Sequence, residues 1–133
     1  MKRVLLCYSL IFVSILTSKA IEPISSLERS MLDTSLIPFY HGVASGDPLP
    51  DRVIIWTRVT PDVDGVVNGT WRVALDTNFT SIVQSGTFTA DSSRDYCVKI
   101  DVSGLQPNTW YFYDFTALGR NSQTGRTKTA PVG

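Results

Sequence analysis

Short segments in which apolar and polar side chains alternate follow one another along most of this chain. In the clearest of them, the apolar residues from Tyr96 to Val102 alternate with Cys97, Lys99 and Asp101. A period of two is typical of β-strands that bury one face, so we predict a strand there with Cys97 directed away from the core. The same reasoning predicts an extended segment after Pro38 and strands at 53–59, 71–75, 82–88, 110–115 and 126–129.

Turn-forming residues separate these segments, at 47–51, 61–65, 76–78, 91–95 and 119–124. Asn68-Gly69 predicts a tight hairpin because both residues tolerate positive φ. About seven strands with turns every 8 to 12 residues indicate an all-β fold, an immunoglobulin or fibronectin type III-like antiparallel β-sandwich. A short helix is expected only in a lead-in at 21–37, where Ser25 and Glu28 have the spacing of a capping box.

The segment 105–113 is the most specific to this fold. Leu105, Pro107, Thr109 and Tyr111 occupy alternate positions, which resembles the fibronectin type III pattern. In that pattern the tyrosine is a tyrosine corner, whose hydroxyl bonds the backbone a few residues upstream. We assign this structural role to Tyr111.

Trp110 and Phe112 project from the opposite side of the same strand. Two apolar residues on one outer face, expected near the outward Cys97, suggest a surface that docks another domain. His41 and Asp47, expected at one end of the sandwich, are the second candidates for interdomain contacts. Because His41 is the single histidine and a metal or nucleophile–base site needs several convergent groups, we assign no catalytic and no metal-binding residue.

Two motifs resemble functional sites, but one has the wrong spacing and the other lacks ligands. Ser45 lies between Gly42 and Gly46, but a nucleophile elbow has one residue between its first glycine and the serine. The run Asp62-Val63-Asp64-Gly65 begins like a calcium loop, yet the third carboxylate and the terminal glutamate are missing. We therefore predict a structural bend and a solvated turn.

Composition limits the possible partners. The 133 residues are 43% apolar, which suits one domain that buries its own core. Twelve Lys and Arg balance 12 Asp and Glu, and they are scattered along the chain. Because no basic field would attract a phosphate backbone, nucleic acid is not an expected partner.

The N-terminus has the layout of a secretory signal peptide. Lys2 and Arg3 precede an apolar run at 4–16, and small residues stand before a cut after Ala20. We therefore expect a signal peptide at 1–20, a mature chain that begins near Ile21 without a transmembrane span, and a secreted protein, or a periplasmic one in a bacterium. Retention of this segment as an uncleaved membrane anchor is the alternative.

Removal of the signal peptide would take Cys7 away and leave Cys97 as a free thiol. An odd thiol in an exported protein is a buried inert sulfur, a partner for a cysteine elsewhere, or a reactive group. Asn68-Gly69-Thr70 and Asn78-Phe79-Thr80 are N-glycosylation acceptor triplets in expected turns. Asn68 and Asn78 are candidates for that modification if export runs through a eukaryotic secretory pathway.

Two terminal motifs carry a family resemblance. The run Phe39-Tyr40-His41-Gly42-Val43-Ala44-Ser45-Gly46-Asp47-Pro48, with 53–59 and the distant run Gly125-Arg126-Thr127-Lys128-Thr129-Ala130-Pro131, resembles the start and end of the N-terminal domain of alkaline phosphatase D (PhoD). That family comprises secreted phosphatases and phosphodiesterases, also described as phospholipase D-like. The resemblance implies that 38–133 is a PhoD N-terminal immunoglobulin-like sandwich domain.

The resemblance also implies phosphate-ester hydrolysis with calcium and iron, in a metallophosphoesterase domain that follows this point in the family. The family's Ser-Cys segment and Gly-Asp-Tyr metal motif do not occur here, so we assign no cofactor to this chain itself. We expect a non-catalytic domain, a fragment or truncated chain, that packs on a metallophosphoesterase domain in cis or acts on one in trans. The alternative is a stand-alone secreted fibronectin type III-like binding module for protein or carbohydrate.

Overall fold

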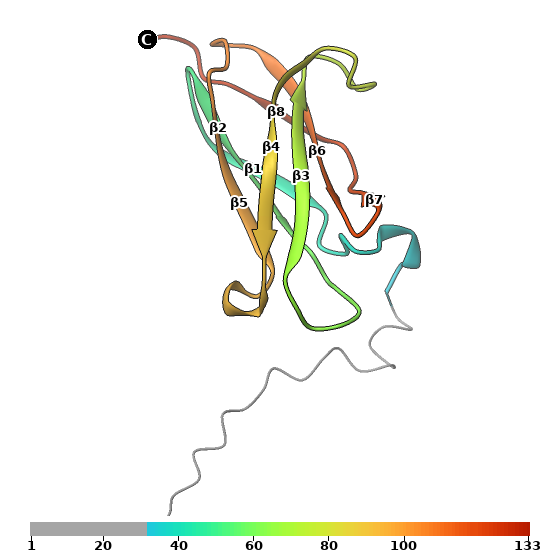
Figure 1. The fold of residues 1–133 in the computed structure, drawn as a ribbon. Helices are drawn as coiled ribbons and strands as arrows, with labels where there is room; N and C mark the ends of the chain where they lie inside the picture. The colour runs from blue at the N-terminus through green and yellow to red at the C-terminus, as the bar shows by residue number, and fades with distance from the viewer. Residues whose placement is uncertain (1–31) are drawn as a thin grey trace, which may run out of the picture.

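The computed structural model describes residues 32–133, in which two antiparallel β-sheets face each other (Figure 1). The first sheet has the strand order β1-β2-β5, with the bounds Val43–Leu49, Arg52–Arg58 and Cys97–Ser103. The second sheet has the order β4-β3-β6-β7, with β8 also paired to β6, and its bounds are Ile82–Ala90, Val67–Ala74, Trp110–Ala117, Arg120–Asn121 and Gly125–Lys128.

Residues 32–133 contain no α-helix and two 3-10 turns, η1 (Thr34–Leu36) and η2 (Ser92–Arg94). The predicted sandwich class is confirmed, with eight strands. The expected signal peptide and the lead-in helix around Ser25 and Glu28 lie outside the described residues.

Alternation buries one face of the first sheet. Val53, Ile55 and Thr57 of β2 are fully buried, whereas the residues between them are only half-buried. The inward alternation predicted from Tyr96 to Val102 is confirmed, although Ile100 is half-buried at the rim of the sandwich. The first sheet therefore gives the core small, stiff β-branched side chains.

The second sheet supplies the large side chains of the core. Tyr111, Tyr113 and Phe115 of β6 are all buried. The Phe115 ring meets Phe88 edge-on, with centroids 6.1 Å apart, and meets Tyr113 in the same way at 6.3 Å. This is the arrangement that aromatic rings prefer over a face-to-face stack.

Glycines make room for these rings. Three cross-strand pairs of the second sheet set an aromatic residue opposite a glycine, namely Phe88 with Gly69, Trp71 with Gly86 and Tyr113 with Gly125. At each of these glycines, a Cβ atom would come within 2.8 Å of a ring atom. The rings can therefore lie against the sheet only because the side chain opposite is absent.

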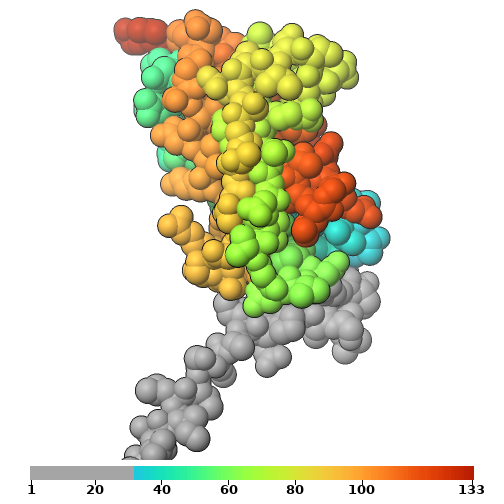
Figure 2. Space-filling model, in the orientation of Figure 1, coloured from blue at the N-terminus to red at the C-terminus, as the bar shows by residue number. Residues whose placement is uncertain are grey.

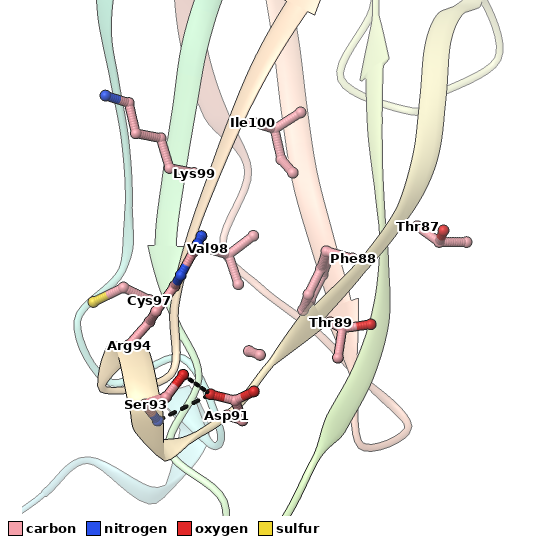
Figure 3. Close-up of a pocket in the computed structure, with 11 residues that line it drawn as sticks. Thr87, Phe88, Thr89, Asp91, Ser93, Arg94, Cys97, Val98, Lys99 and Ile100 are labelled. Atoms are coloured by element: carbon pink, nitrogen blue, oxygen red, sulfur yellow. Dashed lines mark hydrogen bonds between the residues drawn. The ribbon is translucent and has the colours of Figure 1, made fainter.

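The sheets are joined along one side and separate along the other. On the joined side β1 lies against β8, and the Ala130 N–H donates to the Leu49 carbonyl oxygen at 3.2 Å. On the open side the edge strands β4 and β5 run side by side without pairing (Figures 1 and 2). A shallow groove lies between them (Figure 3).

The tight hairpin predicted at Asn68-Gly69 is wrong. Both residues lie inside β3, where Gly69 pairs with Phe88 on one side and with Ala117 on the other. The glycine serves close packing rather than positive φ. The β3–β4 connection is 75–81, and there the Asp76 carboxylate accepts hydrogen bonds from the backbone N–H groups of 78, 80 and 81 at 3.0, 3.1 and 2.8 Å.

Two strand ends also differ from the prediction. β1 extends to Leu49, into the expected loop at 47–51, because the register shifts after Gly46 and Asp47 adopts a φ of 49°. This β-bulge carries the strand past Pro48. Leu75, expected to continue β3 toward the core, is 50% exposed because a register shift ends β3 at Ala74.

Gly69→Ala should destabilise the fold. Its Cβ would lie 2.5 Å from the Thr116 carbonyl oxygen and 2.6 Å from Phe88 Cε1, so backbone and ring must both move. We expect a loss of about 1–3 kcal/mol in the free energy of unfolding, measured by urea denaturation. Gly46→Ala is the matched control, because a Cβ there meets nothing within 4 Å. Equal midpoints for the two variants would contradict the role of Gly69.

Candidate functional site

Arg58 organises a polar cluster on the outer face of the first sheet. Its Nη2 and Nε donate to the two carboxylate oxygens of Asp95 at 2.6 and 3.0 Å, and its Nη1 donates to His41 Nε2 at 2.8 Å. Since a guanidinium group only donates, Nε2 of His41 must be the acceptor nitrogen. The hydrogen bond from Arg58 lowers the pKa of Asp95 below its ordinary value and raises the pKa of Arg58.

The structure separates His41 from Asp47. His41 precedes β1 and bonds Arg58, whereas Asp47 lies at the bulge near the other end of the strand. The strand between them runs from Val43 to Asp47, which spans about 13 Å at roughly 3.3 Å per residue. The expectation that one end of the sandwich carries both residues is therefore wrong.

A second ion pair lies on the outer face of the second sheet. Arg72 donates to both oxygens of Asp114 at 3.0 and 2.5 Å, and Asp114 is only 3% exposed. The guanidinium group also lies over the Phe79 ring, 4.3 Å from its centroid. The pair thereby fixes the 75–81 loop against β3, which is a structural role.

Trp110 lies on that same outer face and is 50% exposed. Arg126 and Lys128 of β8 lie over its ring, with the guanidinium carbon 4.6 Å and the ammonium nitrogen 5.5 Å from the centroid. Phe112, two residues along β6, is half-buried on this face and pairs with Arg126. The structure thus brings the two predicted contact residues of β6 together with two cations.

Tyr111 bonds the backbone upstream of its own strand. It is 2% exposed, and its hydroxyl accepts a hydrogen bond from the Gln106 N–H at 2.8 Å. Thr129, also buried, donates its hydroxyl hydrogen to the Gln106 carbonyl at 2.6 Å and accepts from the Thr109 N–H at 3.0 Å. These bonds tie the 105–109 loop to the residue that follows β8.

Cys97 is a half-buried free cysteine that pairs with Arg58 across β5 and β2. It lies on the outer face of the first sheet, whereas Trp110 and Phe112 lie on the outer face of the second. The expectation that Cys97 adjoins these aromatic residues is therefore wrong. A sandwich places the outward residues of its two sheets on opposite sides of the molecule.

The two acceptor asparagines differ in their surroundings. Asn78 is exposed in the 75–81 connection, whereas Asn68 is exposed on β3 and its side-chain oxygen accepts a hydrogen bond from the Thr89 hydroxyl at 3.2 Å. Only Asn78 occupies the turn expected of both. Glycosylation of Asn68 and Asn78 stays a prediction.

Residues 32–133 hold no group of three or more His, Cys, Asp or Glu side chains placed to bind a metal ion. The described residues therefore offer no ligand set for calcium or iron, which the resemblance places in a separate metallophosphoesterase domain. The groove between β4 and β5 is lined by Phe88, Val98 and Ile100 on its apolar side and by Asp91 and Ser93 at its end (Figure 3).

Within residues 32–133, no helix has the length and apolar character that crossing a membrane requires.

These features define an antiparallel β-sandwich whose polar clusters hold strands and loops in place. The family model described as PhoD-like phosphatase, N-terminal domain, matches residues 26–131. Alkaline phosphatase D of Bacillus subtilis (strain 168) is 43% identical over 105 residues, which are 74% of this chain and 18% of that protein. The chain therefore belongs to the family of PhoD-like phosphatase N-terminal domains.

Solved structures agree with this placement. The structure of PhoD matches with a TM-score of 0.70 and 41% identity, over 75% of this chain and 20% of that one. The sensor domain of the anti-sigma factor RsgI4 from Pseudobacteroides cellulosolvens matches with a TM-score of 0.52 at 14% identity, over 68% of this chain and 93% of that one, a likeness of fold alone. The chain spans about a fifth of the length of its PhoD relatives.

Sequence reasoning missed the partners of the outward charges. Arg58 and Asp95 are 37 residues apart, and Arg72 and Asp114 are 42 apart. Opposite charges on separate strands become neighbours only through the strand order, which the alternation of residues does not specify. A charged residue within a largely apolar strand, such as Arg58 or Asp114, was the available signal.

Tyr111→Phe tests the corner bond. The loss of the hydroxyl leaves the Gln106 N–H without its acceptor, so the free energy of unfolding should fall by about 1–2 kcal/mol in urea denaturation. Tyr40→Phe is the control, because no hydrogen bond of the Tyr40 hydroxyl occurs within the described range. A Tyr111→Phe variant as stable as wild type would show that the bond contributes nothing.

Asp95→Asn should change how stability depends on pH. A carboxylate with a lowered pKa in the folded state contributes stability above its ordinary pKa, near 3.8, and loses it as the pH falls through the folded value. Urea unfolding from pH 6 to pH 2.5 should therefore show a smaller acid-induced loss in the variant. Asp95 is 59% exposed, so the difference will be small. Asp47→Asn, also at positive φ, is the control. Identical pH profiles for wild type and Asp95→Asn would contradict the assignment.

Proposed function

We propose that this chain is the non-catalytic N-terminal sandwich domain of a secreted alkaline phosphatase D-type phosphodiesterase, and that it packs on a metal-dependent phosphoesterase domain. The observation that carries this proposal is the 43% identity to alkaline phosphatase D over a segment that makes up only 18% of that protein. Calcium and iron, which the family resemblance implies, would then bind the phosphoesterase domain.

The polar clusters support a non-catalytic role. His41 is bonded to Arg58, Asp114 is covered by Arg72, and the Tyr96 hydroxyl donates to Asp64. A nucleophile or general base needs a side chain that can reach a substrate. His41 is exposed, but like the other two it holds one strand or loop to another through its hydrogen bond.

Exposed apolar side chains at the end of the sandwich that carries Trp110 support the proposal that the domain packs on another domain. Ala130 is fixed there by hydrogen bonds to Leu49 and Asn108. Three large apolar side chains are exposed at this end, Trp110 at 50%, Leu49 at 51% and Val132 at 71%. Apolar surface of this kind is typical of a region that another domain covers. Under this proposal the phosphoesterase domain begins beyond this end, remote from His41.

A hydrolysis assay tests the proposal. The chain alone should give no metal-dependent turnover of bis(p-nitrophenyl) phosphate above the blank, whereas the same chain joined to the phosphoesterase domain of alkaline phosphatase D should be active. The joined chain should also keep its activity at a higher temperature than the phosphoesterase domain alone, because the covered apolar surface stabilises both partners. Turnover by the chain alone would overturn the non-catalytic role. Equal heat resistance with and without this chain would overturn packing and favour a stand-alone binding module.

A further inference from the structure

One indole ring on the second sheet holds two cations in place. Arg126 and Lys128 both lie within 5.5 Å of the Trp110 ring centroid. Lys128 pairs with Trp110 across β6 and β8, so strand register as well as ring contact fixes its position. We refer to Trp110, Arg126 and Lys128 as the Trp110 cluster.

No carboxylate neutralises the two cations within residues 32–133. Every ion pair in that range uses Arg52, Arg58 or Arg72 instead. The charged residues of β3, β6 and β8 are Arg72, Asp114, Arg126 and Lys128, three cations less one anion, or +2. This surface is therefore basic although the formal charge of the whole chain is zero.

The Arg126 guanidinium group lies over the indole and takes part in no ion pair within residues 32–133, so its N–H groups are available to a carboxylate. A guanidinium group that lies over an aromatic face keeps its N–H groups directed outward in its own plane, where they match the two oxygens of a carboxylate. Trp110 is half exposed and offers an apolar surface beside them. Aromatic residues and arginine together are the usual anchors of protein interfaces.

We propose that the Trp110 cluster is a docking site for an acidic protein surface, in which Arg126 binds a carboxylate, Lys128 adds a second positive charge and Trp110 is the apolar anchor. The exposed Leu49 and Val132 at the same end favour a folded protein partner over a phosphate polymer, because a polymer of phosphates offers little apolar surface to cover them. That the partner surface belongs to the phosphoesterase domain rests on the proposed function. That the Trp110 cluster binds carboxylates does not depend on the proposed function.

Binding of the chain to the separately expressed phosphoesterase domain of alkaline phosphatase D, measured by isothermal titration calorimetry, tests the proposal. The variant Arg126→Gln with Lys128→Gln should bind at least 10-fold more weakly at 50 mM salt, and Trp110→Ala at least 5-fold more weakly. The control Lys99→Gln with Arg120→Gln removes the same net charge from exposed positions on other strands and should bind as wild type. The gap between the double variant and its control should shrink at 500 mM salt, since screening weakens exposed charge pairs.

Two further ligands separate the possible failures. A hexaglutamate peptide and a polyphosphate of equal charge are titrated against the same four proteins. If wild type binds the peptide but not the phosphoesterase domain, and the Trp110 cluster variants lose the peptide, the docking site stands and the proposed function fails. If the cluster variants bind every ligand as tightly as the control does, or if wild type binds none of them, the docking site is wrong. Tighter binding of polyphosphate than of hexaglutamate would overturn the choice of a carboxylate partner.

Discussion

Close contact between aromatic rings and glycines is the constraint on which this sandwich depends. Phe88, Trp71 and Tyr113 are too large to fit between two sheets unless each can lie against its own sheet, and each lies opposite a glycine on the neighbouring strand. The first sheet faces these rings with Val53, Ile55 and other small β-branched residues. Large rings on one side and small side chains on the other pack together in one core.

Polar groups hold strands and loops together both inside and outside the sandwich. Inside, the Tyr111 hydroxyl and the Thr129 hydroxyl satisfy backbone groups of the 105–109 loop, where no strand partner is available. Outside, Arg58 of β2 bonds His41, which precedes β1, and Asp95, which precedes β5. Arg72 of β3 bonds Asp114 of β6 and lies over Phe79 in the 75–81 loop. These charged groups are committed to the fold, whereas the two cations of the Trp110 cluster lie over an aromatic ring and form no ion pair within residues 32–133.

This distribution of roles fits a domain that supports chemistry carried out elsewhere. In a multidomain protein, a rigid sandwich supplies a fixed surface, and one end rich in exposed apolar side chains supplies the contact. Here Trp110, Leu49 and Val132 are exposed at the end of the sandwich that carries the two unneutralised cations. A surface that is both apolar and basic gives the contact affinity and orientation together.

The sequence by itself determined the class of fold, because period-two alternation is a local property that specifies which face of each strand is buried. It also located Tyr111 inside and Trp110 outside, since adjacent residues of a strand must point to opposite faces. Only the tertiary structure decided that Gly69 lies under a ring rather than in a hairpin, that His41 and Asp47 lie far apart, and that Cys97 and Trp110 occupy opposite faces. Those outcomes depend on strand order and register, and these are set by how side chains from distant segments fit together in one core.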